Sequence, residues 1–190
     1  MSNTFLQEID ATIILWDVTK FSRLAADMGA LELASALERF YEHVERYVQR
    51  HGGRIVKFVG DAVLSVVLGS GDVDHAGQAL LAITEAARER QSWLDSCLAA
   101  GAPAMDFKVV ATTGSVLAGY LGTPTVKFWD VLGEPVITAF RLAGVAAERD
   151  QFHLFSAELL DACRLRPAAK ELEAIQVGGR PVRIFHLEQI

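Results

Sequence analysis

The sequence contains few cysteines and no concentrated positive charge. Its two cysteines, Cys97 and Cys163, lie far apart among 190 residues. This usage argues against a disulfide framework and favours a reducing compartment. The formal net charge is −6, and no run of basic residues occurs. Because phosphate backbones are bound by clustered Lys and Arg, nucleic acid is not expected as the main partner.

Long hydrophobic runs and targeting patterns are also missing. No apolar run approaches the roughly 18 residues that a membrane-spanning helix needs. The N-terminus lacks the charged-then-apolar pattern of a signal peptide. The chain also lacks a phosphate-binding Gly-Lys-Ser/Thr loop and a dinucleotide glycine fingerprint, and its five histidines show no zinc-ligand spacing. These absences predict a soluble cytoplasmic domain with no membrane segment and no zinc.

The composition is that of a globular protein. Apolar residues make up 51% of the chain and charged residues 22%. A chain of this length is sufficient to bury a core, and no internal repeat or linker interrupts it. The sequence therefore predicts one domain over residues 1–190.

The apolar patterning predicts a mixed α+β fold. Strands are expected at 9–18, 105–113, 115–121, 126–132, 152–155, 171–177 and 181–187, a hairpin at 54–68, and helices at 20–28, 30–51, 73–99 (with Asp72 as its N-cap), 133–148 and 156–163. This order is not an alternating βα series. It favours a ferredoxin-like α/β sandwich, with a mainly antiparallel sheet, helices packed on it and the first strand at its centre.

Two strand ends carry an acid. The apolar run 11–16 ends at Asp17, and the hairpin over 54–67 turns at Gly60-Asp61. The ferredoxin-like order brings these two acids together. Adjacent carboxylates repel each other unless a cation lies between them, and Mg²⁺ prefers such oxygens. The N–H groups from Val18 to Phe21, where a helix begins, add an anion-binding feature, so a metal–triphosphate site is expected. The alternative is a turn-forming acid and an unrelated strand-end acid, each solvated.

Three segments together resemble one known family. They are DVTKFS at 17–22, HGGRIVKFVGDAV at 51–63 and FWDVLGEPVITAFRL at 128–142. In order and spacing they are similar to the class III adenylate and guanylate cyclase catalytic domain, and the similarity covers nearly the whole chain. Any one of these segments alone is a weak signal, whereas the three together are specific.

The resemblance implies an enzyme that works as a dimer. Asp17 and Asp61 would each bridge two divalent ions, Mg²⁺ or Mn²⁺, that activate the ribose 3′-hydroxyl and hold the triphosphate. The start of the next helix, Phe21 and Ser22, would also contact substrate. Base selection in this family comes from the partner subunit.

The base-selecting positions fall on Lys57 and Asp130, which is the adenine-selecting combination. The alternative for Lys57 is a strand lysine whose amine reaches solvent, and the alternative for Asp130 is a strand-end cap. The implied substrate is therefore ATP.

The sequence departs from the family pattern at one important position. The family places an Asn that orients the ribose and an Arg that stabilises phosphate charge four residues apart on one helical face. Arg141 fills the Arg position, but Ile137 fills the Asn position, and isoleucine cannot hydrogen-bond a ribose. The alternative is that Ile137 only packs at a dimer interface. Two smaller departures are Lys20 for the usual Gly and Glu134-Pro135 for the usual Asp-Thr.

Two main functions remain open from the sequence. One is a homodimeric adenylate cyclase converting ATP to 3′,5′-cyclic AMP and pyrophosphate. The other is a catalytically degenerate module with the cyclase fold, which binds nucleotide or only dimerises to regulate a partner. A third arrangement is a heterodimer in which a different cyclase-like chain supplies the missing Asn.

Overall fold

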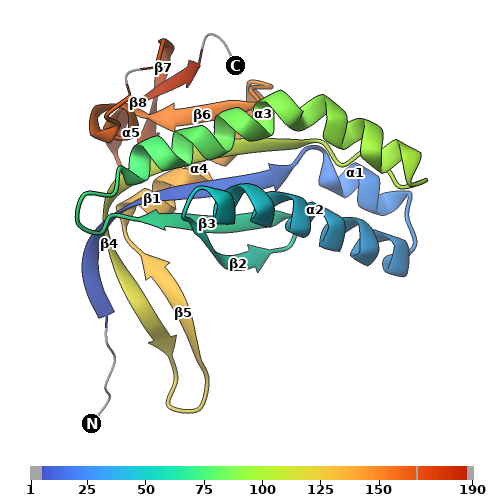
Figure 1. Cartoon of the computed structure of the whole chain (residues 1–190), viewed down its shortest axis with the longest axis horizontal. Helices are drawn as coiled ribbons and strands as arrows, with labels where there is room; N and C mark the ends of the chain where they lie inside the picture. The colour runs from blue at the N-terminus through green and yellow to red at the C-terminus, as the bar shows by residue number, and fades with distance from the viewer. Residues whose placement is uncertain (1–5, 166, 188–190) are drawn as a thin grey trace.

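A computed structural model describes residues 6–165 and 167–187 (Figure 1). Within these described residues, eight strands and five helices alternate irregularly. In order they are β1 (Leu6–Val18), α1 (Phe21–Ala26), α2 (Ala30–Arg50), β2 (Arg54–Val59), β3 (Ala62–Leu68), α3 (His75–Ala99), β4 (Phe107–Gly122), β5 (Lys127–Leu132), α4 (Glu134–Glu148), β6 (His153–Ser156), α5 (Ala157–Ala162), β7 (Ala169–Val177) and β8 (Arg180–Leu187).

All eight strands form one sheet. Its order is β2-β3-β1-β4-β6-β8-β7, and β5 pairs with β4 outside this path. β1 lies between β3 and β4, antiparallel to both, and among the described strands only the β4–β6 pair is parallel. The predicted α+β fold, with a mainly antiparallel sheet and a central first strand, is therefore confirmed.

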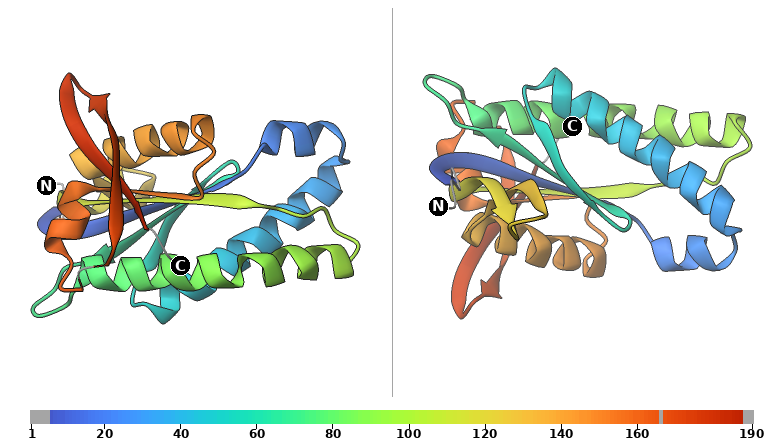
Figure 2. Two further views of the ribbon diagram at one scale, coloured as in Figure 1. Left: turned by 90° about the horizontal axis from the view of Figure 1, so that it is seen from above. Right: turned by 90° about the horizontal axis from the view of Figure 1, so that it is seen from below.

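The helices cover both faces of the sheet (Figure 2). α2 and α3 pack on one face, and α4 packs on the other. β1 serves both sides because successive strand residues point to opposite faces. Ile14 and Trp16 enter the core beneath α2 and α3, whereas Ile13 and Leu15 enter the core beneath α4. Both faces of β1 are thus buried, which fixes its register and the position of Asp17 at its end.

Two local predictions were wrong. β4 runs unbroken through Gly114, where a break between two strands was expected. A Cβ at Gly114 would lie 3.0 Å from the Pro135 ring, so this glycine serves the close approach of α4 to the sheet and does not end a strand. The cap of α3 is Asp74 instead of Asp72, because the Asp74 side chain accepts a hydrogen bond from the Gly77 N–H at 2.8 Å.

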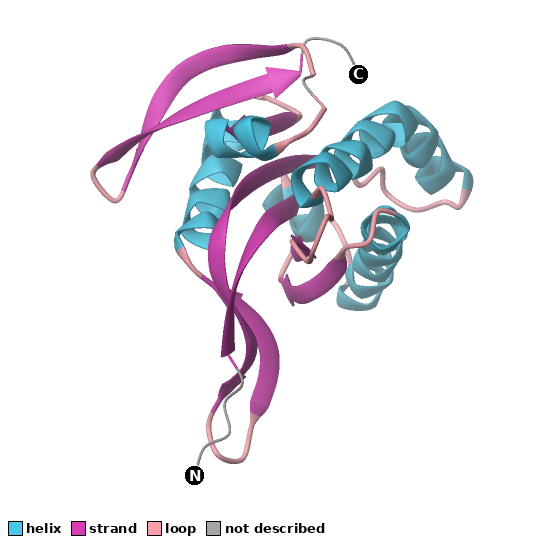
Figure 3. Cartoon of the chain, turned by 60° about the vertical axis from the view of Figure 1, so that its left-hand side comes forward, coloured by secondary structure: helices cyan, strands magenta, loops and turns pink. Residues whose placement is uncertain are grey.

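Two hairpins extend from the body of the fold, β4–β5 and β7–β8 (Figure 3). Large apolar side chains are exposed on the β4–β5 arm and on α4. They are Leu117, Tyr120, Val126, Phe128, Leu132, Ile137 and Phe140, and Phe128 is 70% exposed. An apolar surface of this kind is typical of a protein–protein interface. Within the described residues, no helix is both long and apolar enough to cross a membrane.

Candidate functional site

The structure brings Asp17 and Asp61 together at one end of the sheet. Asp17 lies near the end of β1 and is opposite Ala62 of β3. Asp61 precedes Ala62 in the β2–β3 turn, where Gly60 has a φ of 60°. The Val18 N–H donates to the Asp61 backbone oxygen at 3.3 Å. Two acids from separate parts of the chain are therefore neighbours on adjacent strands.

Burial disfavours the ionised form of both carboxylates, and the charge of Asp61 adds to this effect at Asp17. Burial, and next the charge of Asp61, raise the pKa of Asp17 from 3.8 to about 6. Burial also raises the pKa of Asp61, against a lowering effect of its own backbone hydrogen bond. A divalent cation would remove this cost, and carboxylate oxygens are the donors that Mg²⁺ and Mn²⁺ prefer. The donor set thus fits a hard divalent cation.

In the part of the chain that the structure describes, no larger cluster competes with this pair for a metal ion. Across residues 6–165 and 167–187, no three or more His, Cys, Asp and Glu side chains are grouped so that they could hold a metal. Two protein carboxylates leave most positions around an octahedral cation for water and substrate oxygens. Such a site suits a cation that binds together with a phosphate.

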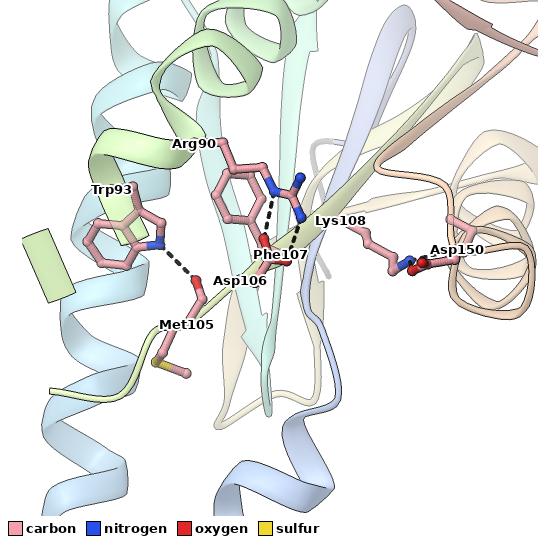
Figure 4. Close-up of polar contacts among 8 residues, drawn as sticks. Arg90, Trp93, Met105, Asp106, Phe107, Lys108 and Asp150 are labelled. Carbon is pink, nitrogen blue, oxygen red and sulfur yellow. Dashed lines mark hydrogen bonds and ion pairs between the residues drawn. The ribbon is translucent and has the colours of Figure 1, made fainter. Parts of the chain in front are cut away.

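Lys108 is a charged neighbour of Asp17 that sequence reasoning missed. It lies directly opposite Asp17 in the β1–β4 ladder and is only 7% exposed. Its ammonium donates to Asp150 Oδ1 at 2.8 Å and to the Ala146 carbonyl at 3.2 Å (Figure 4). Its positive charge partly offsets the raised pKa of Asp17. A lysine inside the apolar run 107–111 was the available signal.

The segment leading into β4 is anchored by α3. Arg90 makes two hydrogen bonds to the carboxylate of Asp106, and Trp93 donates to the Met105 carbonyl at 2.7 Å (Figure 4). The Asp106 carbonyl also accepts from the Thr19 N–H at 2.7 Å. Asp106 therefore connects α3 and β4 to the loop that follows Asp17, which holds the carboxylate pair on rigid elements.

Some of the backbone amides that were expected to bind an anion already donate hydrogen bonds within the protein. The N–H groups of Val18 and Thr19 bond to the carbonyls of Asp61 and Asp106. The prediction for these two amides was therefore wrong, because the β pairing continues past Asp17. The helix begins only at Phe21, after Lys20 in a left-handed conformation. Phe21 and Ser22 lie in its first turn, where N–H groups have no intrahelical partner.

Lys57 and Asp130 also meet. The Lys57 Nζ lies 2.5 Å from Asp130 Oδ2, although the two residues are far apart in sequence. Lys57 lies in β2 and Asp130 in β5, which are not hydrogen-bonded to each other. The two proposed base-selecting groups thus form one pair on a single chain.

Ile137 and Arg141 share an exposed face of α4. Ile137 is 60% exposed, and Arg141 is also exposed one helical turn further along. Arg141 takes part in none of the ion pairs between described residues. The structure therefore leaves Arg141 outside both the carboxylate pair and the Lys57–Asp130 pair.

Comparison with known proteins decides the family. The family described as "Adenylate and Guanylate cyclase catalytic domain" matches residues 6–187. The chain belongs to this family. Among curated relatives, the uncharacterised protein Rv1319c of Mycobacterium tuberculosis (strain ATCC 25618 / H37Rv) is 29% identical over 152 residues. That match covers 80% of this chain but 27% of the relative, so this cyclase domain spans about a quarter of the relative's length.

Solved cyclase structures share the fold. A bacterial light-regulated adenylyl cyclase superposes with a TM-score of 0.84 at 19% identity, covering 98% of this chain and 53% of that one. The guanylate cyclase domain of RhGC from Catenaria anguillulae, solved in complex with GTP, superposes with a TM-score of 0.80 at 19% sequence identity. That match covers 96% of this chain and 98% of the RhGC domain. Because both kinds of cyclase share this fold, the base must be inferred from the site residues of this cyclase domain.

Proposed function

We propose that residues 1–190 act as one cyclase homology domain that converts ATP to 3′,5′-cyclic AMP and pyrophosphate. In this reaction the ribose 3′-oxygen bonds to the α-phosphorus while the bond to the pyrophosphate oxygen breaks, and the hydroxyl proton passes to solvent. The observation that carries the proposal is the adjacency of Asp17 and Asp61, with the raised pKa of Asp17. The Lys57–Asp130 pair supports adenine as the base.

Asp17 and Asp61 would hold two Mg²⁺ or Mn²⁺ ions together with the triphosphate. Bound there, such ions lower the pKa of the ribose hydroxyl and neutralise phosphate charge. Lys108 adds a fixed positive charge on the strand beside Asp17. The first-turn amides of Phe21 and Ser22 are suited to phosphate oxygens. The chain's own contribution is to place charge and hydrogen-bond donors around a phosphate.

Lys57 and Asp130 would select adenine. A lysine ammonium only donates hydrogen bonds and an ionised carboxylate only accepts them. Adenine offers an acceptor at N1 and a donor at its 6-amino group, so it satisfies both side chains. Adenine would replace the direct Lys57–Asp130 contact with one hydrogen bond to each.

The complete site would need a second copy of the chain. Among the residues that the structure describes, Arg141 has no ion-pair partner, and apolar side chains are exposed along the β4–β5 arm and α4. A homodimer burying this surface would set Lys57, Asp130 and Arg141 of one chain against Asp17 and Asp61 of the other. This geometry requires association before turnover.

Ile137 supports a second candidate function. It occupies the exposed face of α4 where the family pattern has an Asn, and it offers no hydrogen bond to a ribose. A degenerate module would bind nucleotide with metal, or only dimerise, without turnover. A heterodimer with another cyclase-like chain would supply the Asn in trans.

A product assay separates these functions. The purified protein is incubated with Mn²⁺ or Mg²⁺ and with ATP or GTP in parallel, and cyclic nucleotide is measured. We expect metal-dependent cyclic AMP in excess of cyclic GMP, with none above background for Asp17→Ala. Cyclic AMP formation equal to that of Asp17→Ala would reject the enzyme. Nucleotide binding without product would favour the degenerate module.

A further inference from the structure

Two side-chain contacts join β2 to β5 at neighbouring positions. The Arg54 guanidinium carbon lies 3.6 Å from the centroid of the Trp129 ring, and Lys57 pairs with Asp130. These strands are not neighbours in the sheet, since β3, β1 and β4 separate them. No backbone ladder pairs β2 directly with β5. The Arg54–Trp129 and Lys57–Asp130 contacts between these strands are made by side chains.

A β-bulge in β2 directs Arg54 and Lys57 to the same side. Residues three apart in a regular strand point to opposite faces. Here the register shifts between Ile55 and Lys57, so Arg54 is opposite Val66 and Lys57 is opposite Leu64. These two partners are two residues apart on β3 and lie in the same apolar cluster beneath α4. The extra residue in β2 thus turns Lys57 toward the side that Arg54 faces.

The Arg54–Trp129 stack is better suited than the ion pair to hold the strands together. The side chains of Lys57 and Asp130 are 43% and 20% exposed, and an ion pair of this exposure contributes little to fixed geometry. Trp129 packs against the apolar cluster beneath α4, so its ring is held in place. Tryptophan is the aromatic side chain that gives the strongest cation–π contacts. Asp130 is the next residue of β5, so a fixed Trp129 also fixes the backbone position of Asp130.

We propose that Arg54 and Trp129 are positioning residues that hold Asp130 at its place beside Lys57 and thereby set the preference for adenine over guanine. This inference rests on the proposed function. Adenine presents an acceptor at N1 and a donor at its 6-amino group, whereas guanine presents a donor at N1 and an acceptor at O6. The same lysine and aspartate would have to exchange places to satisfy guanine. Selection therefore depends on a fixed relative position of Lys57 and Asp130.

Binding of two nucleotides that cannot cyclise tests the inference. The probes are 3′-deoxy-ATP and 3′-deoxy-GTP with Mn²⁺, and their Kd values are measured calorimetrically on the full chain. Wild type is expected to prefer the adenine probe. Arg54→Met and Trp129→Leu are expected to reduce that preference by about tenfold. Trp129→Phe, which keeps an aromatic face, should retain most of it.

A matched arginine provides the control. Arg183 also lies over an aromatic ring, that of Phe185, at 5.3 Å, but it is in β8. Arg183→Met should leave the preference unchanged. Both arginine side chains are exposed, so circular dichroism should show folded protein in each case.

The results of these binding measurements distinguish a failure of the positioning role from a failure of the proposed cyclase function. A wild type that binds neither probe contradicts the proposed function. A wild type that prefers the adenine probe, with Arg54→Met keeping the same ratio, overturns the positioning role alone. If Arg54→Met weakens the binding of both probes equally, the positioning role is overturned as well. Such a result would show a contact that supports the fold but does not change the ratio of the two Kd values.

Discussion

Replacing Asp17 with asparagine is expected to abolish metal-dependent cyclic AMP formation while raising the Tm of the metal-free protein at pH 7 to 8. The substitution removes one of two carboxylates that would bind the divalent ions. We expect the rate to fall by at least the order of 10² that one lost transition-state interaction costs. The same change removes a carboxylate whose ionised form is disfavoured by burial and by Asp61.

The pH dependence of stability follows from the direction of that shift. The pKa of Asp17 is about 6 in the folded chain and 3.8 as an ordinary carboxyl, so between these values the folded state binds more protons. The contribution of Asp17 to the free energy of unfolding therefore falls as pH rises from about 4 to about 6, and it stays low above pH 6. Asparagine does not titrate. The Tm gain of Asp17→Asn should be small near pH 4 and full above pH 6.

Two buried histidines change stability with pH in the opposite direction, so their contribution must be subtracted from the melting curves. Burial lowers the pKa of His43 to about 3 and that of His153 to about 4. Their contribution to stability is full above the ordinary value of 6.5 and declines as pH falls below it. Because wild type and Asp17→Asn both contain these histidines, the difference between their melting curves cancels the histidine contribution and leaves that of Asp17, including its repulsion with Asp61. Asp72→Asn, at an exposed loop acid, is the matched control and should change neither activity nor this difference.

Restoring an amide on α4 is expected to produce the largest gain of activity. Ile137→Asn introduces a hydrogen-bonding side chain one helical turn from Arg141. One positioned donor at a reacting centre is worth on the order of 10² to 10³ in rate. We therefore expect kcat for cyclic AMP formation to rise by that factor, with a smaller change in KM. Steady-state kinetics on the purified variant provide the measurement.

Stability should change little in this variant, because Ile137 is 60% exposed and leaves no cavity. Ile137→Leu, which also lacks a hydrogen-bonding group, is the control and should behave as wild type. If Ile137→Asn binds 3′-deoxy-ATP as wild type does but gains no turnover, the missing amide is not what limits the reaction. Wild type that already turns over at ordinary enzyme rates of about 1 s⁻¹ or more would contradict the degenerate function.

The strand ends and the helix face could be read from the sequence because they depend on local periodicity. Asp17 and Asp61 each end a short apolar run, and the observed sheet order places those ends side by side. Ile137 and Arg141 are four residues apart, so any regular helix sets them on one face. These features needed only the pattern of apolar residues and the order of the elements.

The remaining features depend on contacts between distant segments. Lys108 is buried beside Asp17, and its ammonium donates a hydrogen bond to Asp150, which lies 42 residues later. The bulge at Ile55–Lys57 has no marker such as glycine in the sequence. Gly114 looked like a strand break, yet it serves the packing of Pro135 against β4. Each of these three features depends on a residue that is distant in the sequence, so the local pattern of apolar and polar residues does not predict it.

We expect Asp17 and Asp61 to bind divalent cations beneath a nucleoside triphosphate. A crystal structure of the chain with Mn²⁺ and 3′-deoxy-ATP tests it most directly, since manganese is located by its anomalous scattering. We expect manganese peaks next to both carboxylates, at about the 2.1 Å that small octahedral cations adopt with oxygen. Nucleotide bound with its manganese coordinated by neither Asp17 nor Asp61 would contradict it.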